Sequence, residues 1–205
     1  MVVCTHGMSD HTAGLRLFAH ATVMAHRLHH LAVHPQAGRN TAETVDPDIT
    51  FSDELTLRWG RHRLRLFHNP GKTNDTLNID APTADLAFAS DNLVGRIVYL
   101  SHSSPELLDA ALVKLAALQR QRVVGGHMGC FPGQAVAHAR SYLQTLRKRV
   151  LALRAAVPSA DQASGIQRIA IEDCVAPGVL PVAFEREWHG HNLKIIATHG
   201  TLIPT

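Results

Sequence analysis

Several features that would narrow the function of a protein are scarce in this sequence of 205 residues. Its three cysteines, Cys4, Cys130 and Cys174, are an odd number and lie far apart, which argues against a disulfide framework. No apolar run reaches the roughly 18 residues of a membrane-spanning helix. The net charge is only +3, so it does not indicate nucleic-acid binding.

The composition is that of a globular protein with one unusual feature. Hydrophobic residues make up 45% and charged residues 18%, which argues against disorder. A chain of this length predicts about one domain, with a core large enough to fold without disulfides. No basic segment followed by an apolar one marks a signal peptide, so a cytoplasmic location is the default expectation. Fifteen residues are histidine, which makes metal or acid–base chemistry the first hypothesis to test.

Hydrophobic periodicity predicts that strands and helices alternate. Alternating apolar residues predict a hairpin of 52–59 and 61–67, and short apolar runs predict strands at 1–5, 21–25, 77–79, 86–89 and 122–124. Helical spacing predicts one or two turns within 12–19 and helices over 105–120, 134–155 and 181–198. The stretches 26–47 and 157–178 lack clear periodicity and are expected to be irregular. This order implies a layered α/β domain.

Polar loops follow four of the predicted strands. Because strand ends converge on one edge of a sheet, these loops can meet in space, and they carry the imidazole and carboxylate groups that zinc prefers. Their sequences are Thr5-His6-Gly7-Met8-Ser9-Asp10-His11, Asn69-Pro70-Gly71-Lys72-Thr73-Asn74-Asp75, Phe88-Ala89-Ser90-Asp91-Asn92-Leu93 and Val123-Val124-Gly125-Gly126-His127.

In the order and spacing of these loops, residues 1–150 resemble the metallo-β-lactamase-fold hydrolases. That family has a His-x-His-x-Asp-His loop, a Pro-Gly-His-Thr turn, a Phe-Ala-Gly-Asp strand end and a Val-Val-Pro-Gly-His strand end. The resemblance implies an α/β fold of the four-layer αββα sandwich type with a metal cleft at one edge. Several strands precede the first loop in the family, so a partial sandwich that lacks the opening strands is expected.

Two ligand positions of the family are substituted, because Met8 and Lys72 stand where it has histidine. A thioether is a soft ligand that suits zinc poorly, and a protonated lysine does not coordinate. Both substitutions fall in the first metal position, which keeps His6, whereas the second position is complete. By the resemblance, the cofactor is zinc and the metal ligands are His6, Asp10, His11, His127 and the bridging carboxylate Asp91.

The resemblance also implies a reaction, hydrolysis by a zinc-bound water. Asp10, Asp91 and Lys72 are the expected catalytic residues. Asp91 would orient or deprotonate the water, and Lys72 would stabilise developing oxyanion charge and keep Asp91 ionised beside the altered metal position. The substrate class stays open among esters, thioesters, lactones, lactams and phosphodiesters.

A second hypothesis is a degenerate, non-catalytic family member that binds a metal or a partner. Met8 and Lys72 favour it, and the complete second ligand set opposes it. For the enzyme, the expected partner is a small-molecule substrate, with no nucleic acid and no membrane. An unpaired sheet edge would also suit a homo-oligomer.

The C-terminal region is expected to support the site rather than to form it. Residues 1–155 are predicted to be the metallo-β-lactamase-like domain, and 156–205 an extension that packs on it. Phe184 and Trp188, four residues apart, fit a core stripe, and either His189 or His191 could reach the cleft. A further histidine run matches no metal motif and is expected to be a solvated loop: His20, His26, His29, His30 and His34.

Overall fold

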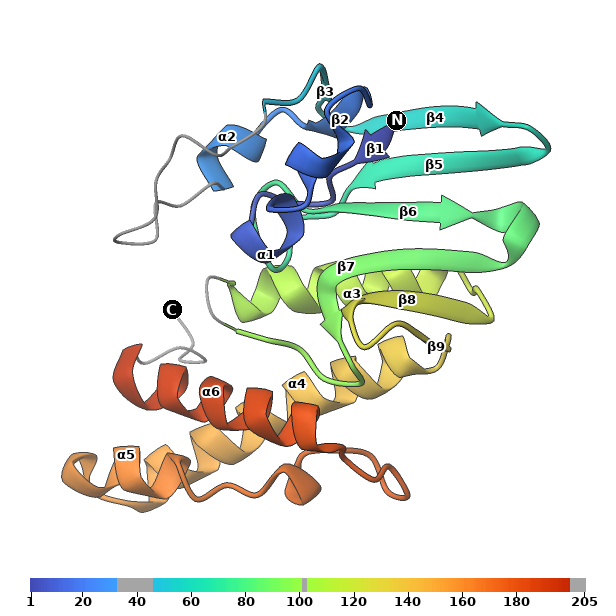
Figure 1. Ribbon diagram of the computed structural model, residues 1–205. Coiled ribbons are helices and arrows are strands. Elements are labelled where there is room, and N and C mark those ends of the chain that lie inside the picture. The colour runs from blue at the N-terminus through green and yellow to red at the C-terminus, as the bar shows by residue number, and fades with distance from the viewer. Residues whose placement is uncertain (33–45, 101–102, 200–205) are drawn as a thin grey trace.

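The computed structural model describes residues 1–32, 46–100 and 103–199, which form two β-sheets and several helices (Figure 1). The smaller sheet is parallel and has the strand order β1-β2-β3. Two short helices, α1 (Ser9–Thr12) and α2 (His29–Ala32), follow the ends of its first two strands. The strands are β1 (Val2–Val3), β2 (Val23–His26) and β3 (Ile49–Phe51).

The larger sheet has six strands in sequence order, β4 to β9. Neighbouring strands are antiparallel except for β7 and β8, which are parallel and are joined through helix α3 (Pro105–Ala117). Such a crossover is the usual connection of parallel strands. The strands are β4 (Glu54–Trp59), β5 (His62–His68), β6 (Leu77–Ala81), β7 (Leu86–Val94), β8 (Arg122–His127) and β9 (Cys130–Pro132).

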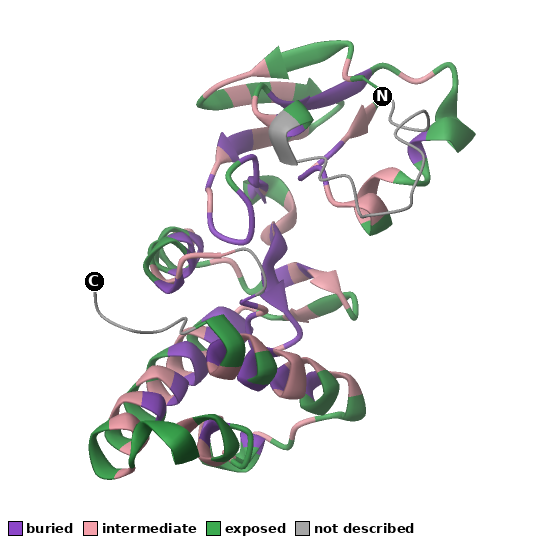
Figure 2. Cartoon of the chain, turned by 90° about the vertical axis from the view of Figure 1, so that its left-hand side faces the viewer, coloured by how far each residue is buried: buried purple, intermediate pink, exposed green. Residues whose placement is uncertain are grey.

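The main core lies between β7, β8 and the helices. Figure 1 shows α3 behind β7 and β8, with the remaining helices α4 (Ala135–Ala156), α5 (Ser159–Ile166) and α6 (Ala183–His199) below them. Fully buried side chains from three helices meet there, among them Leu112, Tyr142 and Ile196. The buried positions of the long helices lie on their inner sides (Figure 2). This packing fixes the strand ends that carry the polar loops.

An irregularity in β7 shapes the edge where the loops meet. The pairing of β7 with β8 shifts register at Ser90, whose φ of 50° is left-handed, and resumes where Val94 pairs with His127. A bulge of this kind re-aims side chains next to functional sites. Asp91 and His127 are thereby brought to the same end of the two strands.

The expected mixed α/β class and partial sandwich are confirmed, but some local predictions are wrong. The stretch 157–178 is not irregular throughout: it contains α5 and a 3₁₀ helix, Ile171–Asp173. Periodicity missed α5 because only Ile166 of that helix is buried. Strands β3 and β9 and helix α2 were also not predicted, and 33–45 lies outside the described residues. The division at residue 155 stays a prediction.

Among the described helices, none combines the length and apolar character that crossing a bilayer requires.

Candidate metal centre

The first loop holds His6 in a fixed orientation. His6 is fully buried, and its Nδ1 lies 3.1 Å from Ser90 Oγ. The Ser90 hydroxyl itself donates to Thr5 Oγ1 over 2.9 Å, so its oxygen is available to accept a hydrogen bond from a protonated His6 Nδ1. That tautomer leaves a lone pair on His6 Nε2, which is the arrangement found for metal-ligating histidines.

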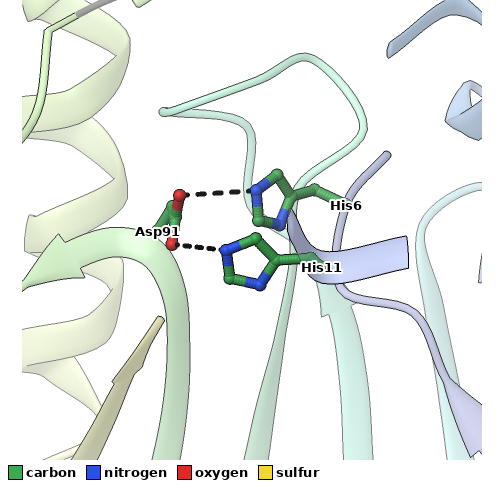
Figure 3. A group of neighbouring side chains, drawn as sticks. All are labelled: His6, His11 and Asp91. Atoms are coloured by element: carbon green, nitrogen blue, oxygen red, sulfur yellow. Dashed lines mark ion pairs between the residues drawn. The ribbon is translucent and has the colours of Figure 1, made fainter. Parts of the chain in front are cut away.

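Both carboxylate oxygens of Asp91 lie close to imidazole nitrogens. His6 Nε2 lies 3.5 Å from Oδ2, and His11 Nε2 lies 3.2 Å from Oδ1. Figure 3 shows both rings, from the loop after β1 and from α1, directed at the carboxylate at the end of β7. His127 Nε2 also lies 3.6 Å from Oδ1. Asp91 is therefore placed between His6 on one side and His11 with His127 on the other.

Asp10, His11 and His127 form a second convergent group. Asp10 Oδ2 lies 3.4 Å from His11 Nε2 and 3.5 Å from His127 Nε2. Ligand atoms of these three residues lie within 4.8 Å of one another, as do those of His6, His11 and Asp91. His11 belongs to both groups. The five residues predicted as metal ligands are thus brought together at one sheet edge.

Buried polar atoms at this edge fit a metal ion. His6 Nε2, His11 Nε2 and Asp91 Oδ1 are buried and have no hydrogen-bond partner of good geometry. A buried polar atom without a partner costs about 1–3 kcal/mol, so three that face one another need an explanation. Two imidazoles and a carboxylate are a donor set that suits zinc. The residues present therefore fit the implied cofactor.

The carboxylate of Asp91 is held in its ionised form. Burial works to raise its pKa, but the contacts with His11, His127 and His6 bring the pKa well below its usual range. The contact with Asp91 also raises the pKa of His127, against the effect of burial. Gly126 of β8 allows this close approach, because a Cβ there would overlap the Asp91 carboxylate.

Lys72 lies in the turn after β5 with its side chain buried, only 1% exposed. Its backbone N–H donates to Asn92 Oδ1 over 2.9 Å, and its ammonium lies 3.6 Å from the centre of the Tyr99 ring. Burial lowers the pKa of Lys72 to about 8, while the charges of Asp91 and Asp10 act to raise it. The lysine is therefore not a solvated surface residue.

Met8 lies at the N-terminal end of α1, half-buried, where its carbonyl accepts the backbone N–H groups of His11 and Thr12.

Aromatic residues of α6 line the centre. The Phe184 and Trp188 rings lie 5.7 and 6.3 Å from the His127 ring, so the predicted core stripe also faces the metal centre, although Trp188 packs against the core as well. His189 points away from the centre, since its ring nitrogens contact Tyr142 Oη and Ile169 O. His191 lies 5.2 Å from the Trp188 ring.

The predicted solvated histidine run is only partly solvated. His20 and His30 are exposed, but His26 and His29 are 2% and 3% exposed, and His34 lies outside the described residues. The His26 ring stacks on His68 at 3.9 Å and bonds to Ser52 O. His29 Nδ1 lies 3.4 Å from Asp75 Oδ2. These contacts with residues distant in the sequence, which local spacing does not report, account for the difference.

Sequence reasoning assigned no role to Ser90 or Tyr99. Ser90 could have been noticed, because it stands directly before Asp91 in the strand-end motif. Tyr99 left no such signal, because it lies in a stretch without periodicity and meets Lys72 only through the fold.

Comparison with known proteins gives a family match and a set of fold relatives. The metallo-β-lactamase superfamily profile matches residues 2–127, more than half of the chain. No curated protein sequence matches. The metallo-β-lactamase from Pontibacter korlensis is similar at a TM-score of 0.59 and 18% identity, over 69% of this chain and 67% of its own. The metallo-β-lactamase from Erythrobacter litoralis is similar at a TM-score of 0.55 and 16% identity, over 69% of this chain and 66% of its own.

A third similar structure is a sec-alkylsulfatase from Pseudomonas sp., with a TM-score of 0.63 and 14% identity. It covers 100% of this chain, whereas this chain spans 43% of it. The chain thus spans about two thirds of the length of the two lactamases and less than half of the sulfatase. At these identities, the similarities show the fold.

Proposed function

Because the chain belongs to the metallo-β-lactamase superfamily, we propose that it is a zinc-dependent hydrolase with one metal ion held by Asp10, His11, His127 and Asp91. The observation that supports this most is the convergence of the ligand atoms of Asp10, His11 and His127 within 4.8 Å, with Asp91 Oδ1 beside both imidazoles. Three or four protein ligands of these types are what a catalytic zinc site uses.

Zinc bound there would supply a Lewis acid and acidify a water molecule at neutral pH. The residues of the chain have separate tasks. Asp91, held ionised, would supply a ligand oxygen and orient the water. Ser90 fixes the His6 ring, and Asp10 completes the ligand set from the exposed side of the centre.

Lys72 replaces one ligand of the first metal position with an ammonium group. A cation buried beside Asp91 offsets part of the carboxylate charge there and can stabilise an oxyanion that develops on the substrate. Because His11 and Asp91 Oδ1 belong to the proposed zinc site, the first position is left with His6 and Asp91 Oδ2. Two donors are fewer than the three protein ligands that zinc sites use, so we propose that this position carries the lysine in place of a second ion.

The substrate is proposed to be a small molecule with a hydrolysable ester-like bond. The candidates are an ester, thioester, lactone, lactam or phosphodiester, and the alkylsulfatase similarity adds sulfate esters to the compounds worth testing.

Hydrolysis of a panel of nitrophenyl carboxylic, phosphodiester and sulfate esters by the zinc-loaded chain tests the proposal. We expect the zinc-loaded chain to hydrolyse at least one class of ester. Removal of zinc should abolish this hydrolysis, and the His127→Ala variant should lack it. Turnover that persists equally after chelation and in His127→Ala would contradict it.

A non-catalytic, metal-binding role is the second candidate, and the burial of Lys72 at a ligand position favours it. It predicts one bound zinc per chain without hydrolysis of any compound in the panel.

A further inference from the structure

The ammonium of Lys72 is placed by an aromatic ring. Lys72 Nζ lies 3.6 Å from the centre of the Tyr99 ring, well inside the range of about 6 Å for a cation–π interaction. Such an interaction is strongest when the cation is removed from water, as Lys72 is. The ring therefore gives the ammonium a specific resting place at the centre.

Tyr99 is in turn fixed by helix α6. The side-chain amide of Asn192, fully buried, binds the peptide groups on both sides of Tyr99: Nδ2 donates to Val98 O, and Oδ1 accepts from Leu100 N, each over 2.8 Å. One turn earlier on the same helix face, the Trp188 ring lies 4.2 Å from the Tyr99 ring. Backbone and ring are thus held by the same element.

A second anchor holds the segment before Tyr99. Glu185, also on α6, accepts the backbone N–H of Arg96 at 2.7 Å and pairs with its guanidinium at 2.7 Å. The side chain of Glu185 is 1% exposed. Helix α6 therefore holds residues 96–100 through Glu185 and Asn192, which lie about two helical turns apart.

We propose that Tyr99 is a positioning residue for the Lys72 ammonium, and that Trp188 and Asn192 of α6 hold Tyr99 in that role. The proposal rests on the proposed function only in treating Lys72 as a working part of the centre. It makes the C-terminal helix a component of the metal centre, and it goes beyond the ligand positions that the family resemblance supplies.

Proton NMR of the chain with labelled lysine tests this directly. The sequence has four lysines, and Lys72→Met identifies the Lys72 signal. An aromatic ring shifts protons over its face upfield, so we expect upfield Lys72 ε-protons and a nuclear Overhauser contact with the Tyr99 ring in the wild type. Tyr99→Phe should keep the shift, because the ring remains. Tyr99→Leu should abolish it.

Phe131→Leu is the matched control, since Phe131 of β9 is a partly buried aromatic residue that packs against the same core. It should leave the Lys72 shift unchanged. Trp188→Leu should reduce the shift, because the Tyr99 ring loses its support. The wild-type contact needs no variant, so its absence would overturn the proposal even if Tyr99→Leu failed to fold. A shift that survives in Tyr99→Leu, or is lost in Phe131→Leu, would also overturn it.

Activity gives a second, separate measurement. If the chain hydrolyses an ester, Tyr99→Leu should lower kcat about tenfold with little change in KM, and Tyr99→Phe should restore it. If no ester is hydrolysed, the NMR shifts still decide the role of Tyr99, so failure of the proposed function and failure of this inference are distinguishable.

Discussion

The backbone N–H of Gly7 donates a hydrogen bond to the Asp75 carboxylate over 2.8 Å, although 68 positions separate the two residues. The same carboxylate accepts the Thr73 hydroxyl at 2.5 Å and lies 3.4 Å from His29 Nδ1. Asp75 is almost fully buried. It therefore ties the loop that carries His6 to the loop that carries Lys72.

Replacing this carboxylate should loosen the metal centre. Asp75→Asn keeps the size of the side chain but cannot accept all of these bonds, so we expect zinc affinity to fall about tenfold or more, as for other residues that support metal ligands. Competition with a chromophoric chelator measures it. Asp161→Asn, at an exposed position of α5, is the control. Equal affinity in the two variants would show that Asp75 does not support the ligands.

The convergence of the candidate ligands could be predicted from sequence because each loop carries its own local pattern. His6 to His11, Asp91 and His127 stand at strand ends in a recognisable order, and strand ends share an edge. Partners from α6 could not be predicted, because Asn192 reaches Val98 and Leu100 across more than 90 positions of sequence. The bond of Asp75 to Gly7 could not be predicted either, because nothing in the spacing reports it.

Replacing residues of the centre one at a time should show how much each contributes to zinc affinity. Asp10→Ala and His127→Ala each remove one of very few ligands, so zinc affinity should fall by more than the roughly 10–100-fold that loss of a residue supporting a ligand costs. Met8→Ala should change it little, because a thioether is a soft ligand that suits zinc poorly. Calorimetric titration of the three variants checks this. Release of zinc by Met8→Ala would mean that the loop is divided differently.

Two substitutions together should rebuild the first metal position. Met8→His with Lys72→His adds two imidazoles beside His6, and zinc sites generally need three protein ligands plus water. We expect the double variant to bind a second zinc ion and each single variant to bind no more than the wild type. Zinc titration of all four proteins measures this. A double variant with wild-type zinc content would contradict the placement of Lys72 at that position.

The anchor of α6 should weaken in acid. Burial works to raise the pKa of Glu185, but bonds from Arg96 and Val182 bring it below its usual value. A carboxyl whose pKa is depressed by folding stabilises the fold above its unfolded pKa, and this contribution is lost as pH falls through the folded value. Glu185→Gln should therefore be less stable by about 1–3 kcal/mol at pH 7, and the difference should shrink below about pH 4.5.

Urea unfolding of the wild type and Glu185→Gln at pH 7 and in acid measures that difference. Glu187→Gln, whose side chain is 70% exposed on the same helix, should match the wild type at both pH values. A difference for Glu185→Gln that is the same at both pH values would mean that the Arg96 pair is not its source.

The central claim is that the centre holds one zinc ion, with Lys72 in place of a second. The most direct measurement is calorimetric titration of zinc into chelator-treated, dialysed protein at neutral pH, with bound zinc counted per chain by atomic emission. We expect one tight site per chain. Two tight sites, or none, would contradict it.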